Sequence, residues 1–249
     1  MNIVEQNYWD NIWKDISLKT VPANHFTRKL IDTYIPGNKG GSVIEIGCYP
    51  GQFLTLFGEK GYVLNGIDLT PATEKLKELL ISNGYKVGEI ICGDFLAMKN
   101  DVKFDVVFSY GFIEHFTNYD EIIIKHLELL KPGGYLILVT PNFKGLFQYF
   151  FHSVFDRNNL KLHVIKSMNP LKWKEIIQAQ KDFEIKFCGY IGGPQFWMTM
   201  DTNIILKYIG IIKLRAWRFI TNKLLFFIDF NKINHSSFSG YCGLIAQKK

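Results

Sequence analysis

Apolar runs and segments of helical spacing alternate along the first 142 residues of the chain. Five short apolar runs predict buried strands, at residues 43–46, 62–70, 89–96, 104–111 and 135–142. Apolar strands that are separated by amphipathic helices indicate a parallel sheet covered on both faces. In such folds ligands bind outside the carboxyl ends of the strands, so the residues at these ends are the candidates for a functional site.

The segments between these strands have the spacing and the end signals of helices. A short helix follows the first strand and ends at Gly61. The next helix begins at Pro71, which suits a first turn, and Gly84 closes it. A third helix is predicted after Thr117, whose spacing to Asp120 approximates a capping box, and it should end at the sequence KPGG.

The last hundred residues have a different organisation. Residues 183–192 and 239–249 predict two further strands, and an aromatic-rich segment followed by a helix precedes the first of them. A long insert, residues 193–238, separates the two strands, and inserts of this length are usually lids or binding elements. We therefore predict an α/β, Rossmann-like fold: a seven-stranded, mostly parallel, doubly wound sheet with helices on both faces and an aromatic-rich C-terminal cap insertion.

Composition and charge narrow the class of protein without selecting a partner. The 249 residues are 47% hydrophobic and 21% charged, which is typical of one globular domain. The net charge of +6 suits an anionic substrate, a nucleic acid or a lipid surface equally. The four cysteines form no CxxC pair and the six histidines no HExxH motif, so neither a metal site nor a disulfide framework is predicted. The N-terminus has acids and no apolar core, so we expect no signal peptide and a cytoplasmic location.

Three acids end three successive strands, and together they indicate the cofactor. The loop EIGCYPG has glycines only at Gly47 and Gly51, whereas a dinucleotide's pyrophosphate requires the GxGxxG spacing. S-adenosylmethionine has no phosphate, and Glu45 would lie near its methionine ammonium group. Asp68, about twenty residues further on, can accept hydrogen bonds from both ribose hydroxyls. Asp94 then suits the adenine amino group, beside an apolar wall formed by the next residue, a phenylalanine.

On these motifs the chain resembles the class I S-adenosylmethionine-dependent methyltransferases, of the small-molecule type. The resemblance covers roughly residues 8–143 and is carried by EIGCYPG, GIDLT, GDF, FDVVFSYGFIEHF and LKPGGYLILVTPN. The family's loop commonly reads E/DxGxGxG, so Tyr49 stands where the middle glycine would be. We interpret its side chain as pointing away from the cofactor, S-adenosylmethionine, whose product is S-adenosylhomocysteine.

The residue patterns and the resemblance together give a candidate site. The predicted cofactor-binding residues are Glu45, Gly47, Cys48, Gly51, Asp68, Leu69, Gly93, Asp94, Phe95, Ser109, Tyr110 and Gly111, with Tyr8 and Trp13 on an N-terminal helix that the resemblance presents as a flap. His115, in FIEHF, is the predicted catalytic residue: a base at the rim where the methyl group should emerge, needed only if the acceptor loses a proton. Glu114 is interpreted as a structural acid and His163 as packing.

The domain boundaries and the acceptor follow less directly. We predict one methyltransferase domain over 1–249, with a helical flap at 1–35, a cofactor-binding core at 43–142 and acceptor-side insertions at 143–182 and 193–238. The acceptor is predicted to be a small molecule, a sugar or a lipid-linked compound, methylated on oxygen or nitrogen. An RNA methyltransferase and a catalytically inactive cofactor-binding protein remain alternatives. A nucleic acid is not favoured, because strand four ends in SYGF rather than NPPY and no RNA-binding module is visible. The oligomeric state stays open.

The insert leaves two interpretations. Basic residues such as Lys213 and Arg218 interrupt its apolar stretch, so it is no membrane span. It either covers the acceptor pocket or makes peripheral contact with a membrane. We favour the cover, because the basic residues do not gather on one helical face; the aromatics that would then select the acceptor are Trp217, Phe219, Phe226 and Phe227.

Overall fold

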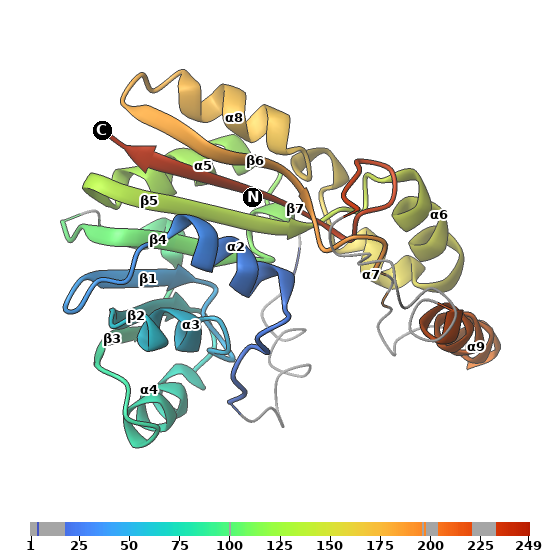
Figure 1. Ribbon diagram of the computed structural model, residues 1–249, viewed down its shortest axis with the longest axis horizontal. Helices are drawn as coiled ribbons and strands as arrows, with labels where there is room; N and C mark the ends of the chain where they lie inside the picture. Colours follow the sequence, from blue (N-terminus) through green and yellow to red (C-terminus); the bar gives the residue numbers. More distant parts are fainter. Residues whose placement is uncertain (1–3, 5–17, 100, 196, 198–203, 221–232) are drawn as a thin grey trace.

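A single seven-stranded sheet organises the molecule (Figure 1). The computed structural model describes residues 4, 18–99, 101–195, 197, 204–220 and 233–249. The strand order is β3-β2-β1-β4-β5-β7-β6, and β7 runs antiparallel to both of its neighbours while the other pairings within the sheet are parallel. The strands are β1 Ser42–Ile46, β2 Val63–Asp68, β3 Val87–Cys92, β4 Phe104–Tyr110, β5 Leu130–Pro141, β6 Phe183–Ile191 and β7 Tyr241–Lys248. The predicted doubly wound, mostly parallel sheet is confirmed.

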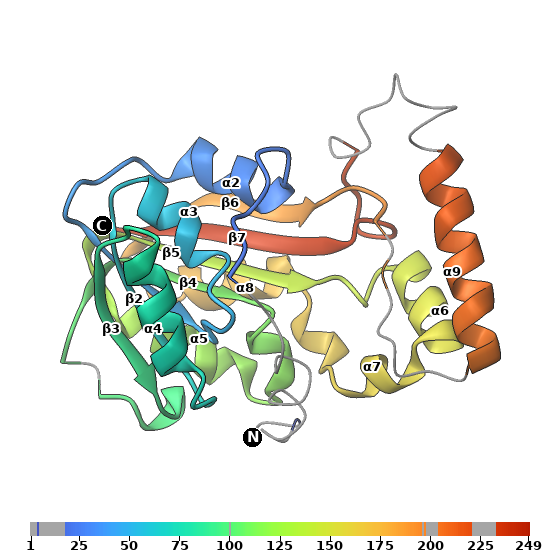
Figure 2. The same ribbon diagram turned by 90° about the horizontal axis from the view of Figure 1, so that it is seen from below.

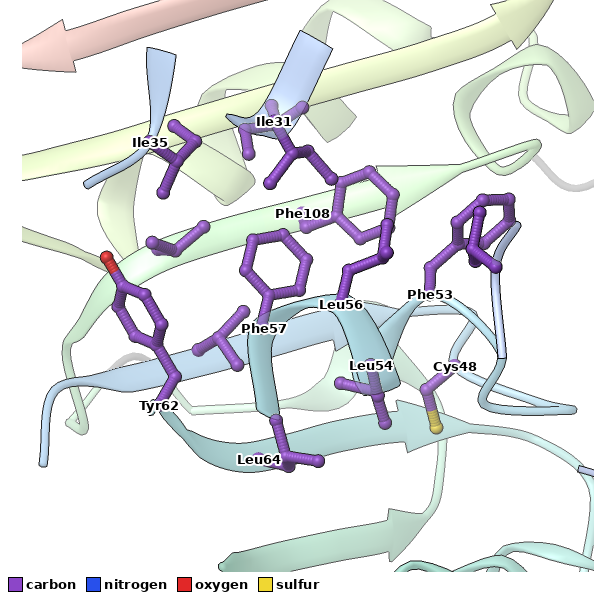
Figure 3. Close-up of a cluster of buried hydrophobic side chains, with 14 of the residues drawn as sticks. Ile31, Ile35, Cys48, Phe53, Leu54, Leu56, Phe57, Tyr62, Leu64 and Phe108 are labelled. Carbon is purple, nitrogen blue, oxygen red and sulfur yellow. The ribbon is translucent and has the colours of Figure 1, made fainter. Parts of the chain in front are cut away.

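Alternation along the strands supplies two cores, one on each face of the sheet. In β4, Val106 and Phe108 belong to one buried cluster and Val107 to the other, because successive side chains point to opposite faces. The first cluster packs α2 (Phe26–Tyr34), α3 (Leu54–Glu59) and α4 (Thr73–Ser82) on the sheet. Figure 3 shows its centre, where Phe57 of α3 points toward Phe108. The second cluster packs α5 (Tyr119–Glu128) and α8 (Pro170–Gln178).

The centre of the sheet creates the crevice in which a ligand can bind. Strand β1 pairs with β2 on one side and with β4 on the other, so the connections leave it in opposite directions. Ile46 and Ser109 are register partners near the carboxyl ends of β1 and β4. The loop after β1 stays attached to the sheet, since the Gly47 N–H donates to the Ile67 carbonyl at 2.9 Å. This is the switch point at which open α/β sheets bind their ligands.

Two predicted helix ends are wrong. The N-cap of α5 is Asn118 with no side-chain cap, so the capping box from Thr117 to Asp120 does not form. The side-chain amide of Asn118 instead donates to the Glu121 carboxylate at 2.6 Å. The helix therefore begins one residue later than a capping box at Thr117 would place it. The helix ends at Glu128, before the glycines, because Leu130 already pairs with β4 and residues 131–134 belong to β5.

The C-terminal part adds helices that lie beyond the sheet. Helix α6 (Leu146–Phe155) follows β5, then α7 (Arg157–Lys161), and α9 (Ile204–Phe219) packs against α6. Figures 1 and 2 both show α6 and α9 past the carboxyl end of β5, away from the helices that cover the sheet. Among the described residues no helix is long and apolar enough to cross a membrane. The predicted flap helix with Tyr8 and Trp13 lies outside the described residues.

Candidate active site

A cavity of about 250 Å³ lies at the carboxyl ends of β1 to β4. Four successive strand ends and the segment after β4 contribute to its walls, as expected for ligand binding in a doubly wound sheet. The lining residues are Gly47, Tyr49, Ile67, Asp68, Leu69, Gly93, Asp94, Phe95, Leu96, Tyr110, Gly111, Phe112, His115 and Phe116. Most of the predicted site residues therefore come together at one place.

Asp68 is held in the cavity wall by two backbone amides. Its Oδ2 accepts from the Tyr49 N–H and its Oδ1 from the Thr70 N–H, each at 3.1 Å. The glycine loop and the end of β2 thus fix the orientation of the carboxylate. Tyr49 also lines the cavity, and burial together with the charge of Asp68 raises the pKa of its hydroxyl. The predicted orientation of the Tyr49 ring away from the cofactor stays a prediction.

The two loop glycines are required for different reasons. Gly47 has φ +72°, and a Cβ there would lie 2.9 Å from the Phe112 ring in the cavity wall. Gly51 has φ +86°, and a Cβ there would collide with Leu76 of α4. Gly47 thus shapes the cavity itself, whereas Gly51 allows α4 to pack against the loop.

Besides Gly51, three predicted cofactor residues among those described do not line the cavity. Glu45 is buried at the end of β1, and its Oε2 has no hydrogen-bond partner among the described residues. Burial, and then the charge of Asp68, hold the pKa of Glu45 well above its usual range. Cys48 is buried with its sulfur facing Gly66 of β2. Ser109 is buried in the sheet between β1 and β5.

Asp94 and Phe95 form the far wall of the cavity. Asp94 Oδ1 accepts from the Leu96 N–H at 2.8 Å and so begins the 3₁₀ turn η1 (Phe95–Ala97). The buried Phe95 ring meets Phe112 edge to face at 5.8 Å between centroids. Lys125 of α5 donates to the Leu96 carbonyl at 2.9 Å and fixes the turn from outside.

His115 also lines the cavity. It ends η2 (Ile113–His115), and its Nδ1 lies 2.8 Å from the carbonyl of Leu162. Burial lowers the pKa of His115 to about 4, although its backbone contacts with Leu162 and Gly111 act in the opposite direction. The ring is therefore neutral near pH 7. Its role as a base stays a prediction.

Sequence reasoning missed several lining residues and one neighbour of His115. Phe112 and Phe116 lie on either side of the Glu-His pair in GFIEHF and line the cavity. Two aromatic residues so close to a predicted catalytic residue could have indicated an apolar cavity wall. His163 lies against His115, with ring centroids 4.8 Å apart. No local pattern reveals this contact, because 47 positions of chain separate the two histidines. Among the described residues of the 193–238 insert, none lines the cavity, and Phe226 and Phe227 lie outside the described residues.

The fold and the cavity define a class I S-adenosylmethionine-dependent methyltransferase. A family model described as a methyltransferase domain matches residues 22–178, and the chain belongs to this family. The cofactor of the family is S-adenosylmethionine. The cavity fits it by its donor set, because the carboxylates of Asp68 and Asp94 both line the cavity. Glu45, at the end of β1 behind this lining, has a buried oxygen without a hydrogen-bond partner among the described residues.

Relatives of known name and structure agree with this assignment. The chain is 29% identical to a ubiquinone biosynthesis O-methyltransferase of Haemophilus ducreyi, over 83% of this chain and 92% of that protein. A protein of the same name from Idiomarina loihiensis is 28% identical over 45% of this chain and 47% of its own length. Against several such curated relatives the match thus spans about half of their length.

Solved structures show the same fold. A methyltransferase from Thiobacillus denitrificans in complex with S-adenosylhomocysteine superimposes with a TM-score of 0.60 at 17% identity, covering 100% of both chains. A second, from Archaeoglobus fulgidus, gives a TM-score of 0.53 at 20% identity, covering 98% of this chain and 100% of that one.

Proposed function

We propose that this protein is an S-adenosylmethionine-dependent O-methyltransferase that acts on a small hydroxyl-bearing molecule. The observation that carries the proposal is the cavity at the strand ends, whose lining includes Gly47, Asp68 and His115. The O-methyltransferase names of the relatives favour oxygen over nitrogen as the acceptor atom.

Each wall has its own task in this proposal. Asp68 accepts the two ribose hydroxyls, Asp94 the adenine amino group, and Glu45 pairs with the methionine ammonium group. The cofactor supplies an electrophilic methyl group on its sulfonium sulfur. The apolar rings of Phe112 and Phe116 exclude water from the space between the walls, and the narrow cavity holds the acceptor in line, which provides much of the acceleration.

His115 is the group nearest to the acceptor in this arrangement. A carbonyl can only accept, so the Leu162 contact at 2.8 Å assigns the proton of the neutral ring to Nδ1. Nε2 can then orient an acceptor hydroxyl or receive its proton. We expect His115→Gln to reduce turnover much more than the affinity for S-adenosylhomocysteine; equal turnover in the variant would leave His115 as a packing residue.

The proposal is tested by isothermal titration with S-adenosylhomocysteine, followed by turnover on hydroxylated aromatic compounds. Asp68→Ala should weaken binding roughly ten- to a hundredfold, because it removes charge-assisted hydrogen bonds worth about 1.5–3 kcal/mol. Asp101→Ala is the matched control, since this acid is exposed and outside the cavity. Unchanged affinity in a folded Asp68→Ala protein contradicts the site, and binding without turnover on any acceptor favours an inactive cofactor-binding protein.

A lipid-linked acceptor is a second candidate, favoured by the surface beyond β5. Helices α6 and α9 pack together and expose large apolar side chains: Leu146, Phe147, Tyr149, Phe150 and Val154 on α6, and Tyr208, Ile209, Ile212 and Phe219 on α9. We call these residues the α6–α9 apolar surface. The exposed Lys213 and Arg215 lie on the same helix α9. Apolar side chains with cations beside them are the signature of a surface that contacts anionic lipid.

Sedimentation with anionic liposomes separates the two candidates. Pelleting that is lost in a Lys213→Gln/Arg215→Gln double variant supports a lipid-linked acceptor and overturns the interpretation of the insert as a pocket cover. Lys19→Gln/Lys29→Gln is the matched control, because it removes the same charge from exposed positions near α2. Failure of the wild-type protein to pellet leaves the small molecule as the acceptor.

A further inference from the structure

Three potential metal ligands meet at the acceptor edge of the cavity. Glu114 and His115 lie on η2, and His163 follows α7. Each of the three offers one ligand atom, and these atoms all lie within 4.8 Å of one another. The two segments are joined by backbone contacts, since the Val164 N–H donates to the Glu114 carbonyl at 2.7 Å. The three side chains are therefore held together by the fold.

Glu114 lacks the partner that a buried carboxyl group requires. Its side chain is fully buried, and neither of its two carboxylate oxygens has a hydrogen-bond partner among the described residues. Burying an unpaired carboxyl group is costly, and burial raises the pKa of Glu114 to about 8. Its interpretation as a structural acid therefore fails to explain what it binds. A cation at the cluster would satisfy both oxygens.

In both histidines one ring nitrogen lies against a backbone carbonyl, as is common in histidines that bind a metal. His115 Nδ1 lies 2.8 Å from the Leu162 carbonyl, and His163 Nδ1 lies 2.7 Å from the Asn159 carbonyl. A ligating histidine typically donates its other N–H to such a carbonyl, which fixes the ring and the tautomer. Each ring offers one nitrogen to the cluster.

We propose that Glu114, His115 and His163 bind one divalent transition-metal cation at the edge of the cofactor cavity, and that this cation binds the oxygen of the methyl acceptor. Two imidazole nitrogens and one carboxylate are a ligand set for zinc or ferrous iron, and three protein ligands leave positions open for a substrate. The sequence predicts no metal here, because 47 residues separate His115 from His163 and no ligand motif connects them.

The cation assigns a chemical task to the buried cluster. A His115 nitrogen that binds the cation cannot also serve as the base, so the cation replaces that role. An acceptor hydroxyl that binds a divalent cation loses its proton to solvent water more readily. The resulting oxygen attacks the methyl carbon, the carbon–sulfur bond breaks, and its electron pair stays on sulfur. His115 lines the cavity, so a cation bound to it would lie beside the space that the reacting groups occupy in the proposed function. This second half of the proposal rests on the proposed function, whereas metal binding itself does not.

The first experiment measures binding without any turnover. Protein dialysed against a chelator is titrated with Zn²⁺ by calorimetry and with Co²⁺ by visible absorption, and we expect one site per chain. Glu114→Gln and His163→Gln should each weaken the Kd at least roughly a hundredfold, more than the loss of a second-shell contact costs. Glutamine has nearly the same shape as the glutamate it replaces, so the Glu114→Gln variant should fold. Its melting temperature checks this.

His126→Gln is the matched control. His126 is also fully buried, its Nδ1 lies 2.7 Å from the Ile122 carbonyl, and its Nε2 has no partner among the described residues. It lies outside the cluster, so the variant should keep the wild-type Kd for Zn²⁺. The proposal is overturned if the wild-type protein binds no Zn²⁺, or if the cluster variants bind it as tightly as His126→Gln does.

A second experiment separates this proposal from the proposed function. Turnover is compared in chelator-treated and Zn²⁺-reconstituted protein, with the affinity for S-adenosylhomocysteine as the reference for an intact cofactor site. We expect turnover to fall on metal removal and to return on reconstitution, with the affinity unchanged. Full turnover of metal-free protein overturns the role of the cation in the reaction and leaves the methyltransferase proposal intact.

Discussion

The cofactor side and the acceptor side of the molecule are built differently. On the cofactor side, Gly47, Asp68 and Asp94 each follow a strand of one hydrogen-bonded sheet, so the ladder of backbone hydrogen bonds sets their positions. On the acceptor side, His115 meets a segment 47 residues away, and α6 and α9 pack on each other beyond the sheet. The first arrangement fixes the positions of the cofactor-binding residues. In the second, residues that contact the acceptor can be substituted without disturbing the hydrogen bonds of the sheet.

The largest effect that would sharpen this comparison comes from Gly47→Ala. The left-handed φ of +72° costs alanine about 1–2 kcal/mol, and the new Cβ would press on the Phe112 ring at 2.9 Å. If the loop moves to relieve this contact, the affinity for S-adenosylhomocysteine should fall roughly 5- to 30-fold, the equivalent of a further 1–2 kcal/mol. Calorimetric titration measures the affinity for S-adenosylhomocysteine, and urea unfolding measures the free energy of unfolding.

Gly84→Ala is the control for backbone strain alone. Gly84 has a similar φ of +83°, but a Cβ there would meet nothing within 4 Å. It lies just beyond the C-cap of α4 and does not line the cavity. We expect this variant to lose comparable stability and to keep its affinity. Equal affinity loss in both variants would show that the loop has no special role.

A smaller effect is expected from Glu45→Gln, through the dependence of stability on pH. The folded protein raises the pKa of Glu45 above the unfolded value of about 4.3, so the folded state holds a proton that the unfolded state loses. This contribution is fully present below about pH 4.3 and is lost as the pH rises through the folded pKa. Glu45→Gln should therefore show a flatter decline in unfolding free energy above that pH.

Cofactor binding provides an independent measurement at the same residue. Pairing with a methionine ammonium group favours the carboxylate, so binding at a pH below the raised pKa of Glu45 should release a proton from it. Titrations in two buffers of different ionisation enthalpy count that proton. Glu45→Gln should release none, and an unchanged proton count would mean that Glu45 is not the partner of the ammonium group.

The fold and the cofactor side could be predicted from the sequence because both depend on local order along the chain. Apolar runs fix the strands, and a parallel sheet brings their carboxyl ends together, so Asp68 and Asp94 are placed by pattern alone. Cys48 and Ser109 show the limit of this reasoning. Both stand next to residues that line the cavity, but their side chains are buried elsewhere, because alternate residues of a strand or tight loop face opposite sides.

The acceptor side could not be predicted, because it depends on contacts between distant segments. The cluster of Glu114, His115 and His163 forms only when the segment after α7 hydrogen-bonds to η2. The α6–α9 apolar surface likewise combines two helices from insertions on either side of β6. Helical periodicity indicates an apolar face on each helix, but it cannot say whether the partner is protein or solvent.

The smallest effect on stability is expected from Phe150→Ala. Phe150 belongs to the α6–α9 apolar surface, so this variant tests whether that surface binds the acceptor. Phe150 is 65% exposed, so its truncation should change the free energy of unfolding by no more than about 0.5 kcal/mol. The affinity for S-adenosylhomocysteine should stay within roughly twofold for the same reason. If the α6–α9 apolar surface binds the acceptor, the KM of the acceptor rises while these two quantities stay constant.

Leu171→Ala is the control, because Leu171 is 59% exposed on α8, a helix that packs on the sheet. A KM that rises equally in both variants, or in neither, would remove the α6–α9 apolar surface from acceptor recognition and confine specificity to the cavity.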